Sequence, residues 1–194
     1  NIGIDGGKDS LSMSVKLEKQ TINSPGNIVI SGYASCPNIY KKVTPEFKKT
    51  DSSIIFIDFS NGNARLGGSV FLRQFNQIGN NPPTFQMQNK LRDCFNIVQQ
   101  YILDDKILAL HDKSDGGIIT TLSEMCIASN IGADIQIYSQ FSIYEELFNE
   151  ELGVVIEINK EFIDEFRNSL IQKNIKFYTI GNTNNKNYLN CAVN

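Results

Sequence analysis

The stretch ILALHDKSDGGIITTLSEMCIA, residues 107–128, decides the fold class. It opens with four apolar residues, Ile107–Leu110, a short run typical of a buried strand. A polar segment follows, and Gly116 and Gly117 then precede residues 118–128, which we expect to form a helix. Strand, polar loop and helix in direct succession are the repeating unit of mixed α/β folds.

The same alternation extends in both directions from this stretch. Strands are predicted at residues 54–57, near Ile135, at 154–158, and near Phe177 and Leu189; helices are predicted at 70–75, 85–103, near Tyr144 and at 161–170. Thr84, after two prolines, is the expected N-cap of the 85–103 helix. Further upstream, residues 11–17 and 28–33 are predicted strands around a turn at 21–26, and residues 36–50 a connecting segment. The fold class is therefore α+β or mixed α/β.

Composition excludes several classes of protein. The 194 residues carry a net charge of -3 with 41% apolar residues, enough apolar material for a sizeable core. The basic residues are scattered, which argues against nucleic acid as a partner, and no apolar run is long enough to span a membrane.

The four cysteines are widely spaced and form no CxxC pair, which favours reduced thiols in a cytoplasmic protein over a zinc or redox site. The chain begins without methionine and reaches its first motif within a few residues, from which we expect a fragment of a larger protein.

The segment HDKSDGG, residues 111–117, is the stronger candidate site. Polar groups that leave the end of a buried strand gather where open α/β sheets bind ligands. A glycine pair at a helix N-terminus favours phosphate, and carboxylates supply the hard oxygen ligands that magnesium prefers. The alternative is an ordinary helix start, capped by Ser114 or Asp115, with no ligand.

A second candidate is GGKDS, residues 6–10. Its glycines allow an anion to approach the backbone, and Lys8 adds a mobile charge, while Asp9 and Ser10 offer oxygen ligands. The spacing is not that of a P-loop, so a glycine-rich turn with solvated charges stays an alternative.

Three further features favour structural roles. His111 is the single histidine of the chain and has no serine or cysteine motif to activate, so a supporting role is expected. The glycines of GNARLGG, residues 62–68, either cradle phosphate or permit a tight turn. The acidic pair in LFNEELG, residues 147–153, is expected to be a solvated helix end.

Six segments taken in order resemble one family, the large form of phosphoribosylformylglycinamidine synthase. They are GGKDSLSMS at 6–14, VTPEF at 43–47, LGGS at 66–69, LALHDKSDGG at 108–117, TLSEM at 121–125 and LFNEELGVVIEI at 147–158. The resemblance implies the end of an aminoimidazole-ribonucleotide-synthetase-like N-terminal-type subdomain at residues 1–48, and a C-terminal-type subdomain at 51–194.

The resemblance also implies a reaction and its ligands. Members of this family use ATP to activate the amide of formylglycinamide ribonucleotide, and ammonia from glutamine then gives the amidine. Carried over to this sequence, Asp112 is the expected magnesium ligand and Ser114 the expected nucleotide contact. Lys8, Asp9 and Ser10 are expected near the phosphates of ATP or ADP.

The glutaminase domain and the other synthetase-like units of the family have no counterpart in these residues, so the chain by itself is expected to be inactive and to expose apolar surface for self-association. Two other interpretations stay open. In the first, the chain is a structural module whose nucleotide site is auxiliary. In the second, the chain is part of a small-molecule kinase of the same superfold.

Overall fold

The computed structural model describes residues 3–8, 13–23, 28–36 and 38–194, which form two compact units, residues 1–37 and 38–194. In the first unit, β1 (Ser14–Lys16) and β2 (Thr21–Asn23) pair as an antiparallel hairpin. The amide of Leu17 donates to the carbonyl of Gln20 at 2.8 Å and closes the turn between them. The two units are described separately.

Two expectations for this first unit are wrong. Residues 21–23, predicted as part of a turn, form β2, because the chain already reverses at residues 17–20. Residues 28–33, predicted as a strand, have no strand conformation, and Ile28, Val29 and Ile30 are 86–89% exposed. Apolar sequence alone does not make a strand when no neighbouring strand offers hydrogen-bond partners.

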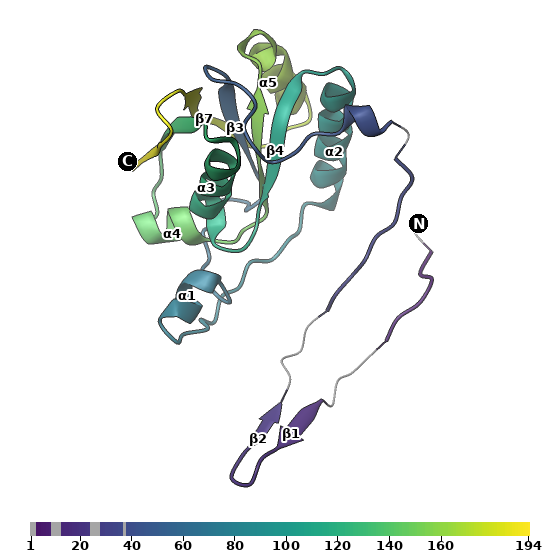
Figure 1. Cartoon of the computed structure of the whole chain (residues 1–194), viewed down its shortest axis with the longest axis vertical. Helices are drawn as coiled ribbons and strands as arrows, with labels where there is room; N and C mark the ends of the chain where they lie inside the picture. The colour runs from purple at the N-terminus through teal and green to yellow at the C-terminus, as the bar shows by residue number, and fades with distance from the viewer. Residues whose placement is uncertain (1–2, 9–12, 24–27, 37) are drawn as a thin grey trace. The chain divides into compact units, whose positions relative to one another are not determined.

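The second unit is a mixed α/β domain built on a six-stranded sheet (Figure 1). The strand order is β4-β6-β3-β7-β5-β8, antiparallel except for the β5–β8 pair. The strands are β3 (Ser53–Asp58), β4 (Ile107–Lys113), β5 (Gly132–Ile137), β6 (Gly153–Ile158), β7 (Phe177–Asn184) and β8 (Leu189–Val193). The helices are α1 (Val70–Gln74), α2 (Gln88–Leu103), α3 (Gly117–Ser129), α4 (Ile143–Phe148) and α5 (Ile163–Gln172), with short 3-10 turns at Ile39–Lys41 and Lys160–Phe162.

Strand β3 shows why the sheet is covered on both faces. All six of its residues are buried. Ile54 and Phe56 pack into a core that includes Leu122 of α3, whereas Ile55 and Ile57 pack into a second core that includes Phe166 of α5. Side chains alternate between the two faces of a strand, so a continuous apolar run requires helices on both sides. Each buried side chain contributes about 1.5–3 kcal/mol relative to an exposed one.

The segment before β3 is tied to the sheet through a buried carboxylate. Glu157 of β6 is fully buried and accepts hydrogen bonds from the Ser52 hydroxyl at 2.6 Å and from the amides of Lys48 and Lys49 at 2.8 and 3.2 Å. Phe47 is also buried in the core beside α3. These contacts place residues 47–52 in the second compact unit, which begins at residue 38. The division into subdomains at 1–48 and 51–194 stays a prediction.

Most predicted elements are present, with two corrections that bear on the site. Helix α2 begins at Gln88, so Thr84 is not its N-cap. Thr84 instead accepts hydrogen bonds from Arg65, at 2.8 Å to its hydroxyl and 3.2 Å to its carbonyl. Strand β4 runs on through Lys113, which places His111 and Asp112 in the strand and not in the loop after it.

Candidate functional site

Asp112 lies on an exposed face of β4 and is contacted by its neighbour. The Nδ1 atom of His111 lies 3.2 Å from the Asp112 carboxylate, whose side chain is 68% exposed. The other ring nitrogen of His111 lies 2.8 Å from the carboxylate of Glu124 in α3. His111 thus links Asp112 to the helix behind it, while the Asp112 carboxylate stays open to solvent.

Ser114 and Asp115 are exposed in the short turn between β4 and α3. Neither side chain caps α3: the N-cap is Gly116, without a side-chain cap hydrogen bond. The alternative in which Ser114 or Asp115 acts as an ordinary side-chain cap is therefore wrong. Both side chains are therefore exposed without a capping role, two and three residues after Asp112.

The glycine pair is required by the backbone and by packing. Gly116 and Gly117 have φ values of 85° and 74°, in the left-handed region that favours glycine. A Cβ atom on Gly117 would lie 2.5 Å from the carbonyl oxygen of Leu147 and 2.7 Å from the Cα atom of Phe148. The second glycine therefore lets α3 pack directly on the end of α4.

The N-terminus of α3 already holds a carboxylate from within the chain. One oxygen of Glu150 accepts hydrogen bonds from the amide of Gly116 at 2.9 Å and from the amide of Val70, at the start of α1, at 2.8 Å. An acidic side chain at this place satisfies helix N–H groups and interacts favourably with the helix dipole. The Gly116 amide is thus engaged internally, and the oxygen atoms of Asp112 and Ser114 are the more accessible groups.

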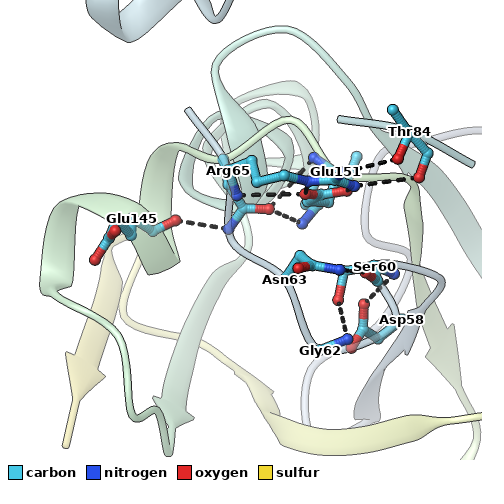
Figure 2. Close-up of polar contacts among 10 residues, drawn as sticks. Asp58, Ser60, Gly62, Asn63, Arg65, Thr84, Glu145 and Glu151 are labelled. Carbon is cyan, nitrogen blue, oxygen red and sulfur yellow. Dashed lines mark hydrogen bonds and ion pairs between the residues drawn. The ribbon is translucent and has the colours of Figure 1, made fainter. Parts of the chain in front are cut away.

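The neighbouring residues of LFNEELG are buried, so the prediction of a solvated helix end is wrong. Glu151 is 1% exposed and forms a two-point ion pair with Arg65, with nitrogen–oxygen distances of 2.5 and 2.9 Å (Figure 2). The amide of Arg65 donates to the same carboxylate at 3.3 Å. Because an unpaired buried carboxylate is very costly, Arg65 has to be held close to Glu151.

The loop GNARLGG is therefore a structural support for this ion pair. Figure 2 shows two hydrogen bonds of the turn before it: the amide of Ser60 donates to the Asp58 carboxylate at 2.8 Å, and the amide of Gly62 donates to the Ser60 hydroxyl oxygen at 3.1 Å. The amide of Gly67 donates to the carbonyl of Asn81 at 3.1 Å, and a Cβ atom on Gly67 would clash with that backbone. Of the two interpretations, the tight turn with close packing explains these glycines.

Lys113 is buried at the end of β4, opposite in character to Asp112. It is 5% exposed, donates to the Asn149 amide oxygen at 2.7 Å and lies over the ring of Phe56, 5.1 Å from its centroid. Burial lowers the pKa of Lys113 from 10.5 to about 8, and the charges of Asp58, Glu146 and Glu151 partly offset that effect. The ammonium lines a cavity of about 770 Å³ at the carboxyl ends of β3, β4 and β5.

Comparison with known proteins gives this domain a family. Residues 59–194 match the family described as AIR synthase related protein, C-terminal domain. The chain belongs to this family.

Curated relatives and solved structures agree with that assignment. A probable phosphoribosylformylglycinamidine synthase of Arabidopsis thaliana, chloroplastic/mitochondrial, is 41% identical over 93% of this chain, and the enzyme of Dictyostelium discoideum is 40% identical over 96%. The chain spans 13% and 15% of those two proteins. PurL of Thermotoga maritima, in structures with FGAR and with ATP, shares the fold at TM-scores of 0.66 and 0.60, each over 80% of this chain and 27% and 25% of that protein, at 10% and 11% identity. Thiamine-monophosphate kinase of Stenotrophomonas maltophilia shares it at a TM-score of 0.53, over 77% of this chain and 52% of that protein, at 14% identity.

The structure of this AIR synthase-related domain brings together only part of the predicted site. Asp112 and Ser114 lie within three residues of each other at the end of β4. Lys8 belongs to the other compact unit and is exposed there, and Asp9 and Ser10 lie outside the described residues. The assignment of these five residues to one site stays a prediction.

The oxygen donors at the end of β4 suit a magnesium ion that is shared with a phosphate ligand. Among the residues that the structure describes, no group of three or more His, Cys, Asp or Glu side chains is arranged to hold a metal alone. Magnesium keeps several waters and is commonly bound through one or two carboxylates together with substrate phosphates. The exposed Asp112 carboxylate, with Asp115 and Ser114 beside it, fits that kind of shared coordination.

Three residues that organise this end of the AIR synthase-related domain were not identified from the sequence: Arg65, Lys113 and Asn149. Arg65 and Asn149 could have been noticed from their motifs, GNARLGG and LFNEELG. Charged and polar side chains next to a buried strand are costly to bury unless they pair with each other. The burial of Lys113 could not be predicted, since a lysine between Asp112 and Ser114 is expected in solvent.

The burial of Lys113 predicts a specific pH dependence of stability. Between about pH 8 and pH 10.5 the unfolded chain still binds a proton at Lys113 that the folded domain has released. The free energy of unfolding of the wild type therefore rises with pH, relative to that of Lys113→Met. We expect Lys113→Met to be the more stable protein at pH 7, and its advantage to shrink by pH 10. Urea denaturation at both values measures this, with the exposed Lys173→Met as the matched control. If the free energies of unfolding of wild type and Lys113→Met changed with pH in parallel, the lowered pKa of Lys113 would be contradicted.

Proposed function

We propose that this domain is part of a phosphoribosylformylglycinamidine synthase, an ATP-dependent ligase that converts formylglycinamide ribonucleotide, glutamine and ATP to formylglycinamidine ribonucleotide in purine biosynthesis. The observation that carries the proposal is the 41% identity to the Arabidopsis protein over 93% of this chain. The likeness of the fold to PurL, whose structures hold ATP and FGAR, supports it without deciding the chemistry.

Within such an enzyme, this domain contributes ligands to a nucleotide site that other domains complete. ATP phosphorylates the amide oxygen of the substrate and leaves as ADP, and ammonia released from glutamine by a glutaminase domain then displaces phosphate to form the amidine. Asp112 would hold magnesium, whose charge offsets that of the phosphates. Ser114 would donate a hydrogen bond to the nucleotide, and His111 keeps the Asp112 carboxylate in place through its contacts with Asp112 and Glu124.

Whether the site turns over nucleotide or holds it as a structural element depends on the rest of the protein. The carboxylate of Asp112 and the hydroxyl of Ser114 would serve binding in either case. Lys8, Asp9 and Ser10 are proposed, from the same resemblance, to act near the nucleotide phosphates. A related kinase shares only the fold, with a TM-score of 0.53, so the synthase is the proposal that the sequence identity favours.

We also propose a cytoplasmic location. The four cysteines, all in the described part of the chain, are free thiols, and burial raises the pKa of Cys94 to about 12 and that of Cys126 to about 11. Unreactive buried thiols are expected where disulfides do not form. No helix in the residues that the structure describes is long and apolar enough to cross a membrane.

The nucleotide proposal is tested by calorimetric titration of Mg-ADP and Mg-ATP into this chain. If the end of β4 is sufficient for binding, Asp112→Asn removes a magnesium ligand and weakens the affinity about tenfold or more. Asp164→Asn, an exposed acid of α5 whose side chain is 86% accessible, is the control that keeps wild-type affinity.

Equal affinities of Asp112→Asn and the wild type would remove Asp112 from the site. Should neither protein bind, the same titration is repeated on a chimera of the Dictyostelium relative in which this chain replaces the matching segment. Formylglycinamidine synthesis by the chimera tests the proposed reaction separately from the role of Asp112.

The chain on its own is proposed to self-associate through an aromatic surface on α1 and α4. The ring of Phe71 in α1 stacks on Phe148 of α4, with centroids 4.6 Å apart, and also contacts the rings of Phe75 and Tyr144. Phe75, Tyr144 and Ile78, which follows α1, are 61%, 59% and 76% exposed. Exposed apolar patches of this kind mark interaction sites. Sedimentation velocity is expected to show concentration-dependent association that Ile78→Ser combined with Tyr144→Ser reduces and Ile127→Ser does not. A monomer at every concentration would contradict the proposal.

A further inference from the structure

The cavity at the carboxyl ends of β3, β4 and β5 is separate from the exposed oxygen atoms of the HDKS segment. Neither Asp112 nor Ser114 lines it. Its wall is formed by strand residues such as Phe56, Ile137 and Tyr178, and by the loop at residues 138–141. With a volume of about 770 Å³, it is large enough for a small organic molecule.

Lys113 is the buried charge of this cavity, and Asn149 fixes its position. The Asn149 amide nitrogen donates to the carbonyls of Glu145 and Glu146 at 2.6 and 3.1 Å, so its oxygen is turned toward Lys113. A lysine has three N–H donors. Asn149 is the one hydrogen-bond acceptor that the described residues give Lys113, which leaves donor capacity facing the cavity.

No carboxylate in the described residues neutralises Lys113 through direct contact. Asp58 and Glu146 line the same cavity and act on Lys113 only through longer-range attraction. Asp58 accepts a hydrogen bond from the Ser60 amide and lies 3.3 Å from the ammonium of Lys176, so its oxygen atoms are committed elsewhere. A lysine almost never stays fully buried without an anionic partner.

An aromatic pair forms the floor beside the two lysines. Phe56 of β3 and Tyr178 of β7 are cross-strand neighbours whose rings are nearly parallel, at 13°, with centroids 6.5 Å apart. Lys113 lies over the ring of Phe56 at 5.1 Å and Lys176 over the ring of Tyr178 at 5.3 Å. Cations held above a flat apolar surface suit a ligand that has both an anionic group and a planar apolar part.

We propose that this cavity binds a small organic anion, a phosphate ester or a carboxylate, with its charged group on Lys113 and its planar part against Tyr178. The site is independent of the proposed nucleotide site on Asp112. An anion placed there supplies the charge-assisted hydrogen-bond partner that the described residues do not give Lys113.

The test uses phenyl phosphate and benzoate as probes, with orthophosphate and phenol as the charge-only and ring-only comparisons. In protein labelled with ¹³C-lysine, the Cε signal of Lys113 is identified by its absence from Lys113→Met. Phenyl phosphate or benzoate is expected to displace that signal. Calorimetry is expected to give an affinity about tenfold weaker for Lys113→Met, the loss of one charge-assisted hydrogen bond.

Lys113→Met retains the apolar stem of the side chain, and Asn149 keeps a hydrogen bond from the Glu151 amide at 3.3 Å, so this variant is expected to fold. Lys173→Met, an exposed lysine outside the cavity, is the control with wild-type affinity. A stronger response to one probe identifies phosphate or carboxylate as the preferred group. The proposal is overturned if neither probe displaces the Lys113 signal up to its solubility limit, if Lys113→Met binds as tightly as wild type, or if phenol binds as well as the two anions.

Discussion

The buried ion pair between Glu151 and Arg65 is the constraint on which this end of the domain depends. Glu151 stands at the point where the chain enters β6, and its carboxylate has almost no contact with solvent. A buried carboxylate without a partner would cost several kcal/mol, so the loop that carries Arg65 has to close over the sheet. Arg65 in turn holds the segment at Thr84, which precedes α2. One electrostatic requirement therefore connects β6 with two loops that are far apart in sequence.

The two residues before Glu151 extend the same connection to the candidate sites. Glu150 gathers the starts of α1 and α3 on one carboxylate oxygen, and Asn149 holds the ammonium of Lys113. Strand β4 ends between these contacts, with Asp112 exposed and Lys113 buried. Because neighbouring side chains of a strand point to opposite faces, the end of β4 presents a carboxylate to solvent and an ammonium to the interior cavity. The proposed magnesium and anion sites are thus held in place by the same three-residue segment.

The sequence predicted the fold well where local apolar patterns were continuous. The run Ile54–Ile57 indicated a strand buried on both faces, and the glycine pair at 116–117 marked the start of α3. It failed where the structure is decided by contacts between distant residues. Thr84 had the chemistry of an N-cap, but its oxygen atoms bind Arg65 instead. Residues 28–33 had the composition of a strand, but none of the strands in the described part of the chain pairs with them.

The candidate site shows the same limit. Asp112 and Ser114 were predicted from the HDKSDGG pattern and from a resemblance to a known family; both are exposed, and their binding role stays a prediction. The burial of Lys113 and Glu151 was not predicted, because a charged residue among other charged residues is expected in solvent, and only the packing of the sheet reveals that both are buried. The glycines first considered for phosphate binding turned out to be needed for positive φ angles and for close approach of α3 to α4.

Urea denaturation of Glu151→Ala measures how far the Glu151–Arg65 pair holds this end of the domain together. The variant leaves the Arg65 guanidinium, whose side chain is 15% exposed, without its carboxylate. We expect the free energy of unfolding to fall by about 3–5 kcal/mol. Glu161→Ala, an exposed acid in the 3-10 turn before α5, should change it by no more than about 0.5 kcal/mol. A Glu151→Ala protein as stable as Glu161→Ala would show that the Glu151–Arg65 pair does not hold this end of the domain together.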